Sequence, residues 1–305
     1  MDTLKIELAN YKGLKVKKNG LKVEDKEIDN ALDYLQKSRA KIITINKPAQ
    51  KGNRVEIDFE IKNTGVKIED GDSKNHPLIL GEGRFLPGFE EKLEGMKSGE
   101  EKEFSLKVPH DWPDKRIADK NLDFKVKMNL VQERILPEIN DEFAKSLGSF
   151  DSLSGLRKNI QDGLMQEKEL KEKQRIRLEL IEKVAENSKI DVPENLINQE
   201  AEAMINEFKA NVTVFGMDFE IYLKGIKKTT DDLKKEWMPQ AEKRVKIRLC
   251  LKAIAEKEKI EVSNEEIENI DSEKPKEYTK NILINEKVFE LLEQEAIINS
   301  DTNYE

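Results

Sequence analysis

The sequence predicts an α+β protein in which an antiparallel sheet wraps one short helix and an all-α, multi-helix region follows. Two hydrophobic periods lead to this prediction. Apolar residues alternate with polar ones between about residues 54 and 133, which is typical of half-buried strands with one wet face. From about residue 150 they recur instead at the 3.6-residue spacing of helices.

The first part of the chain predicts short strands followed by one helix. The strand-like pieces LKIEL and LKVKK come first, and the acidic VEDKEID begins a helix over about 25–39. The stretch NKPAQKGN has the Pro, Gly and Asn residues of a boundary. We therefore expect a leading strand-and-helix segment, a sheet domain and a helical domain at 1–47, 48–133 and 134–305.

The middle region contains three alternating segments and one helical one. VEIDFEIK, KEFSLKV and LDFKVKMNLV each place their apolar residues on one side, so each predicts a strand. Between the first two, Phe89, Leu93 and Met96 recur at helical spacing after Pro87. One sheet packed over this single helix would bury both sets of apolar residues together, which is a small α+β domain.

The remaining sequence predicts helices joined by short connections. We expect them over about 150–187, from Pro193 onward, over 231–258 and over 275–298. Outside their apolar stripes these segments are strongly charged, and the simplest interpretation is a bundle with solvated faces.

Composition excludes several classes of function. The net charge is −8, and the most basic stretch, LKVKKNGLKV, lacks interleaved aromatics, so we expect no nucleic-acid partner. No segment approaches the roughly 20 apolar residues of a membrane helix, so we expect no membrane partner. The start MDTLKIELAN has no apolar core of a signal peptide, so we expect a cytoplasmic protein.

Few side chains are suited to covalent or metal chemistry. His76, His110 and Cys250 are the only histidines and cysteine, and Cys250 lies in an apolar helical run where a buried, inert thiol is expected. Gly81 and Gly83 do not form a phosphate loop, because Leu86 replaces the third glycine of that motif. We expect no cofactor and no metal, and an enzyme built from this sequence would work by shape and desolvation.

Several motifs resemble known families. NRVEIDFEI, LILGEGRFLPGFEEKLEGMKSGEEKEF and LDFKVKMNLV resemble an FKBP-type peptidyl-prolyl isomerase domain. LPEINDEFAKSLG, IDVPENLINQE and EKRVKIRLCLKAIAEKEKIEVSNEEI follow in the order typical of the trigger factor family, and the resemblance covers about residues 1–268. It implies a chaperone of unfolded or nascent polypeptides that carries an isomerase domain.

The chain differs from that family in two places. The family's ribosome-docking loop, Gly-Phe-Arg-x-Gly-x-x-Pro, is absent, so the resemblance gives no basis for ribosome binding by this chain. We expect either a truncated polypeptide or a form without ribosome docking. The tail after Glu268 is also shorter than is usual in the family.

The resemblance also implies which residues form a proline site. Phe89 would be its floor, the backbone N–H of Leu86 would bind the peptide, and Glu69 would lie beside the substrate carbonyl. His76 replaces a family Phe, and the apolar or aromatic walls would be Phe59, Ile68, Phe85, Trp112 and Phe124. The alternative for Phe59, Phe89 and Phe124 is ordinary core packing, and Glu69 is by default an exposed loop residue.

A second candidate surface lies in VTVFGMDFEIYL, where Phe215, Met217 and Phe219 are close in sequence. Met and aromatic side chains suit promiscuous binding of unfolded clients, although each of these three residues has core packing as its alternative.

Three hypotheses remain open from the sequence. The first is an isomerase that also holds clients, and the second is a holdase whose FKBP-like domain binds peptides without useful turnover. The third is a factor that assembles folded subunits. For location, the alternative to the cytoplasm is a periplasmic chaperone of related architecture.

Overall fold

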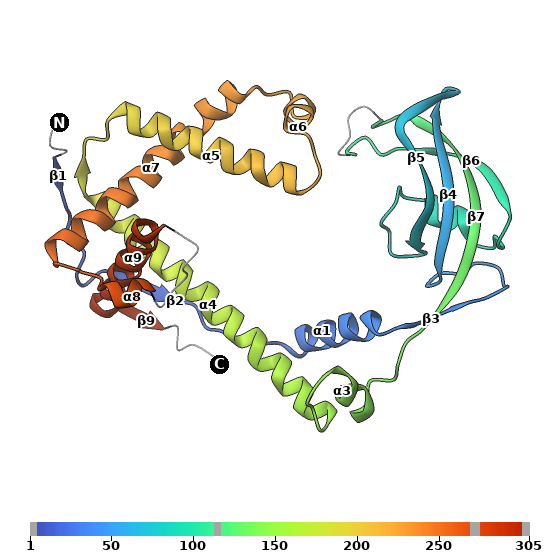
Figure 1. Cartoon of the computed structure of the whole chain (residues 1–305), viewed down its shortest axis with the longest axis horizontal. Helices are drawn as coiled ribbons and strands as arrows, with labels where there is room; N and C mark the ends of the chain where they lie inside the picture. Colours follow the sequence, from blue (N-terminus) through green and yellow to red (C-terminus); the bar gives the residue numbers. More distant parts are fainter. Residues whose placement is uncertain (1–4, 113–116, 269–274, 301–305) are drawn as a thin grey trace. The chain divides into compact units, whose positions relative to one another are not determined.

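A computed structural model describes residues 5–112, 117–268 and 275–300, except for the side chains of residues 69, 70 and 300. The chain divides into two separately packed units. One contains residues 23–162, and the other combines residues 1–22 with 163–305. Figure 1 shows the sheet of the first unit and the helices of the second.

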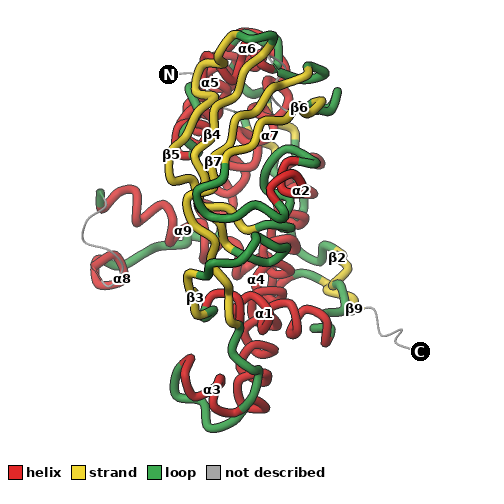
Figure 2. The backbone as a smooth tube through the Cα atoms, turned by 90° about the vertical axis from the view of Figure 1, so that its right-hand side faces the viewer, coloured by secondary structure: helices red, strands yellow, loops and turns green. Residues whose placement is uncertain are grey.

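The first unit is built around a five-stranded antiparallel sheet. Its strands are β3 (Lys41–Thr44), β4 (Arg54–Asn63), β5 (Val66–Ile79), β6 (Glu101–Lys107) and β7 (Asn121–Ile135). The order is β3-β7-β4-β5, and β6 pairs with β7 beyond the end of β3 (Figure 2). Neither β3 nor the long polar strand β5 was predicted.

The short helix α2 (Phe89–Leu93) covers the apolar face of this sheet, as predicted. The alternating residues Val55 and Ile57 of β4 are fully buried. They pack in one core with residues of β7 and α2. Strand β7 contributes Leu122, Phe124, Val126 and Met128, and α2 contributes Phe89 and Leu93. The predicted fold class is therefore confirmed for this unit.

Two further helices belong to the first unit. The predicted helix α1 (Asp25–Ser38) begins with a capping box, in which Glu24 and Glu27 each accept the other's backbone N–H. Helix α3 (Asp141–Leu147) begins where the side chain of Asn140 accepts the N–H of Phe143 at 3.0 Å.

The second unit is mostly helical, as predicted. Its helices are α4 (Leu153–Asn187, counted here from residue 163), α5 (Glu194–Val214), α6 (Phe219–Gly225), α7 (Thr230–Lys257), α8 (Asn264–Glu268) and α9 (Lys276–Glu295). Leu180 of α4, Cys250 and Ile254 of α7 and Leu292 of α9 meet in one core. Cys250 is buried there, and burial raises the pKa of its thiol.

Residues 5–22 pack with this helical unit. β1 (Ile6–Glu7) pairs with β8 (Lys189–Ile190), and β2 (Lys15–Lys18) pairs in parallel with β9 (Ile297–Ser300). The structure thus places residues 5–22 with the helices, whereas they were predicted to form one segment with the helix at 25–39. The helix predicted to reach residue 298 ends at Glu295, because Ile297 donates its N–H to Leu14 in the new strand (2.8 Å).

Over the described ranges, with gaps at 113–116 and 269–274, no helix is long and apolar enough to span a bilayer.

Candidate functional site

The loop that leads into α2 is held by one buried carboxylate. Glu90, in the first turn of α2, accepts the backbone N–H groups of Gly81, Gly83 and Arg84 at 2.6, 3.1 and 2.9 Å. Gly81 has a φ of +91°, and a Cβ there would lie 2.5 Å from Cγ of Lys51, so glycine is required. The loop before the helix therefore has a fixed shape.

An aromatic cluster lies under this loop. The Phe85 ring stacks on Phe89 with a centroid distance of 4.0 Å and an interplanar angle of 28°. Phe59 on β4 meets Phe85 edge-on at 5.3 Å and His76 at 5.5 Å. Phe124 on β7 meets Phe89 at 5.2 Å. The structure therefore brings together five of the predicted site residues from three strands, the loop and α2.

Phe89 was predicted to be the floor of an open site, but its ring is covered by its neighbours. Phe89 has 0% of its surface exposed, because the Phe85 ring covers one face and Phe124 lies against it. Phe59, His76 and Phe85 are half-buried and form the rim. If the Phe85 ring lay elsewhere, the face of Phe89 would lose its packing contacts, so stacking of the two rings is favoured.

A cavity of about 370 Å³ opens beside this rim. Its lining includes Phe85 and His76 together with the charged residues Arg54, Glu82 and Arg84. Glu82 is paired with Arg84 at 3.1 Å and with Arg134 at 3.2 Å, so its charge is already balanced.

The backbone N–H of Leu86 is the predicted donor to a bound peptide. Its side chain is buried in the core. Among the residues that the structure describes, no oxygen accepts the N–H of Leu86. A backbone donor beside an aromatic hollow is what an extended peptide requires.

The other predicted residues of this site lie nearby or are not described. Ile68 on β5 and Trp112 after β6 are half-buried and pack against the same core. The side chain of Glu69 lies outside the described residues.

Two members of the site were not predicted from the sequence. Phe104 on β6 lies 5.6 Å from Phe89 and stacks on Phe124 at 5.5 Å, yet it was assigned only to a strand. Glu90 was not predicted to have a role in the site. Its position immediately after Phe89, one turn below a glycine loop with free N–H groups, was the available signal.

The second predicted surface lies at the turn between α5 and α6. Phe215 is 80% exposed, and Val214, Met217 and Ile221 beside it are exposed as well. We call these four residues the tip patch. Gly216 reverses the chain there with a φ of +75°.

Phe219 is a correction to the predicted surface. It is only 5% exposed and packs with Leu223 in the core below the patch, where its ring meets Phe208 at 6.0 Å. Asp218 caps α6 by accepting the N–H of Ile221 at 2.9 Å. The helix that starts there directs positions 219 and 223 inward and position 221 outward.

Comparisons with known proteins match both units. Residues 46–129 match the family described as FKBP-type peptidyl-prolyl cis-trans isomerase. Residues 152–299 match the family described as the C-terminus of bacterial trigger factor protein. The chain therefore combines an FKBP-type domain with a trigger factor helical domain.

Individual relatives are similar over most of the chain. A trigger factor of Caldicellulosiruptor saccharolyticus is 33% identical over 98% of this chain and 72% of its own length. A trigger factor of Carboxydothermus hydrogenoformans is 37% identical over 86% of this chain and 62% of its own. The chain belongs to the trigger factor family.

A solved structure has the same fold. It comes from work on promiscuous substrate recognition by the trigger factor chaperone in folding and assembly, and it matches with a TM-score of 0.52. The match covers 95% of this chain and 73% of that one at 20% identity. The predicted combination of an FKBP-like sheet domain and a helical domain is confirmed.

Proposed function

We propose that this protein is a chaperone that holds unfolded polypeptides and catalyses cis-trans isomerisation of their prolyl bonds. Uncatalysed rotation about an X–Pro amide takes tens to hundreds of seconds, because resonance stabilises the planar form. That resonance also makes the planar carbonyl strongly polar, and the polarity falls as the amide twists. An apolar, shaped site therefore favours the twisted form over the planar one.

The aromatic cluster is the observation that carries this proposal. A prolyl ring stacked on Phe89 would be enclosed by Phe59 and Phe124, while the N–H of Leu86 binds a carbonyl of the peptide. In the described conformation the Phe85 ring takes that place on Phe89. Binding thus requires Phe85 to rotate away, and the prolyl ring then replaces it on the face of Phe89. No nucleophile is needed.

The helical unit supplies the holding activity. Exposed apolar residues scattered singly are normal, but the tip patch places four of them between residues 214 and 221. Phe215 and Met217 have side chains that adapt to different apolar partners. Collapsed or unfolded clients expose such partners, so the patch supports binding without sequence preference.

One experiment tests the isomerase part. The rate of cis-trans isomerisation of a prolyl tetrapeptide is measured with the unchanged protein and with Phe89→Leu, which removes the flat ring and keeps an apolar side chain. We expect kcat/KM to fall at least tenfold. Phe208→Leu makes the same substitution in the aromatic cluster of the helical unit and serves as the matched control.

The main alternative is a domain that captures peptides without turnover, and the covering of Phe89 by Phe85 is the observation in its favour. Under that alternative the unchanged protein binds the tetrapeptide, does not accelerate its isomerisation, and still suppresses aggregation of an unfolded protein. That combination of results would reject the isomerase proposal and leave the holdase.

A further inference from the structure

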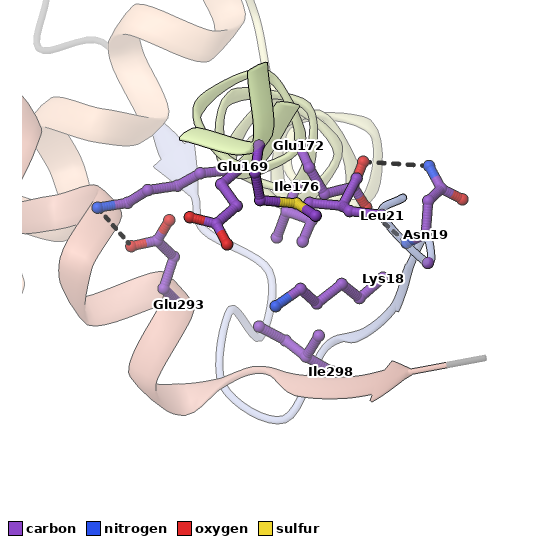
Figure 3. Close-up of a pocket in the computed structure, with 11 residues that line it drawn as sticks. Lys18, Asn19, Leu21, Glu169, Glu172, Ile176, Glu293 and Ile298 are labelled. Atoms are coloured by element: carbon purple, nitrogen blue, oxygen red, sulfur yellow. Dashed lines mark hydrogen bonds and ion pairs between the residues drawn. The ribbon is translucent and has the colours of Figure 1, made fainter. Parts of the chain in front are cut away.

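The helical unit contains a cavity that none of the residues discussed so far lines. Its volume is about 710 Å³, within the range of sites that bind ligands. Leu21, Met165, Ile176 and Ile298 give it an apolar lining. Figure 3 shows it between α4, the segment that follows β2, and β9.

The wall of this cavity is held in place by a buried carboxylate. Glu172 of α4 accepts the backbone N–H of Asn19 at 2.6 Å and its side-chain amide at 3.1 Å. Nε of Arg175 donates to the same carboxylate at 2.9 Å. The hydrogen bond from Arg175 is the main reason that the pKa of Glu172 is lowered to about 2. These hydrogen bonds fix the position of α4 relative to the segment that follows β2.

The ribbon of β2 and β9 has one closed edge. On β2, the carbonyls of Lys15 and Lys17 point away from β9, and the side chains of Lys183 and Arg175 donate to them. Charged side chains that cover a strand edge prevent further pairing. No strand can be added on that side.

The other edge of the ribbon is open. Ile297 pairs with Lys15 and donates its N–H to Leu14, so the alternation of a parallel ladder turns the N–H and C=O of Ile298 away from β2. Within the described ranges no backbone group pairs with them. The side chain of Ile298 at this edge lines the cavity (Figure 3).

The mouth of the cavity also carries an unneutralised cation. The side chain of Lys18 extends between Ile298 and the residues of α4 (Figure 3), and none of the described carboxylates lies within 4.0 Å of its ammonium group. The other lysine of the lining, Lys173, lies 3.9 Å from Glu293. Glu169 of α4 also lines the cavity, so an incoming carboxylate is favoured only on the Lys18 side.

We propose that an extended apolar segment of an unfolded polypeptide binds here by adding a strand to the free edge of β9. Alternate side chains of that segment enter the cavity, since successive residues of a strand point to opposite faces. An acidic side chain on the cavity face pairs with Lys18. This inference rests on the proposed holding function and adds a site and a binding mode to it.

The test uses the full chain and a peptide without proline that carries fluorescein on its N-terminal amine, fluorescein-Thr-Val-Thr-Val-Thr-Asp-Thr-NH2. Two derivatives carry backbone N-methyl groups on alternate residues, so that each blocks a different edge of the peptide. We expect fluorescence anisotropy to show that one derivative binds at least tenfold more weakly and that the other binds like the parent. Equal affinities for the two derivatives, or no binding of the parent peptide, would overturn the proposal.

Charge reversal gives a second measurement. Lys18→Glu is expected to weaken binding of the peptide about tenfold. The same variant should bind a peptide with Asn in place of Asp with an affinity within twofold of that of the unchanged protein. The control is Lys15→Glu, which makes the same change on the opposite face of β2 and should leave both affinities within twofold. Equal effects of the two reversals would show that Lys18 does not contact the client.

Failure of the proposed β9 site can be distinguished from failure of the proposed chaperone and isomerase function. The peptide has no proline, so failure to bind leaves the isomerase assay unaffected. Substitution of Phe215 and Met217 in the tip patch should leave peptide affinity unchanged while suppression of aggregation falls. Loss of peptide binding in that variant would place the site at the patch and overturn the assignment to β9.

Discussion

The two candidate binding regions of this protein use aromatic side chains in opposite ways. In the FKBP-type domain Phe89 is fully buried, and its neighbours meet it at defined angles on three sides. At the tip patch Phe215 is 80% exposed on a chain reversal. Close packing constrains the rings of the first region, and under the proposed function it selects a prolyl ring once Phe85 has rotated away. The second region lacks that constraint, and under the same proposal it accepts many apolar partners.

The strongest test of this comparison is the same substitution in both regions. Phe89→Ala should lower the free energy of unfolding of the FKBP-type domain by about 3–5 kcal/mol, because it leaves a cavity in a packed core. Phe215→Ala removes an exposed side chain and should change stability by no more than about 0.5 kcal/mol. Urea unfolding followed by circular dichroism measures both. Similar losses in the two variants would mean that the tip patch is part of a core.

The next largest effect is expected at the loop above the aromatic cluster. Glu90→Gln replaces one of two accepting oxygens with an amide group that cannot accept the N–H groups of Gly81 and Gly83. We expect a loss of about 1–3 kcal/mol in stability and a fall in isomerase kcat/KM. The neighbouring Glu91→Gln is the control, since that side chain is exposed. If both variants behave alike, the carboxylate of Glu90 does not shape the site.

Much of the fold followed from residue periodicity, and the failures have physical causes. The alternation of VEIDFEIK predicted β4, because one face of that strand is buried. Strand β5 carries the polar run EDGDSKNH, and two register shifts against β4 disturb its alternation further. Its apolar signal was too weak to predict a strand.

The site was predicted through motifs, and its details required the structure. The Pro-Gly-Phe-Glu motif located Phe89, but ring stacking by Phe85 depends on side-chain rotation that no sequence pattern encodes. Phe219 looked like its exposed neighbours in sequence until Asp218 was seen to start a helix that turns it inward. β9 was missed because its partner, β2, lies at the other end of the chain.

Substitution in the tip patch is expected to separate the two regions by function. The double substitution Phe215→Ser and Met217→Ser should weaken suppression of aggregation at least tenfold, because complete burial of one such side chain against a client contributes about 1.5–3 kcal/mol. Light scattering of a chemically unfolded protein measures this effect. Isomerisation of the prolyl tetrapeptide serves as the control and should be unchanged. A parallel fall in both activities would contradict the separation of the two regions.

The smallest predicted effect concerns Phe85, whose ring stacks on the face of Phe89. If the site binds peptide only when this ring has rotated away, its apparent affinity is the intrinsic affinity multiplied by the fraction of molecules in that open state. Phe85→Ala removes the competing ring and should therefore lower KM, which raises kcat/KM about threefold. Arg84→Ala, at the exposed neighbouring position, is the control. A fall in kcat/KM would show instead that the Phe85 ring is a wall that contacts the bound proline. The prolyl ring would then have to approach Phe89 from the cavity that His76 lines.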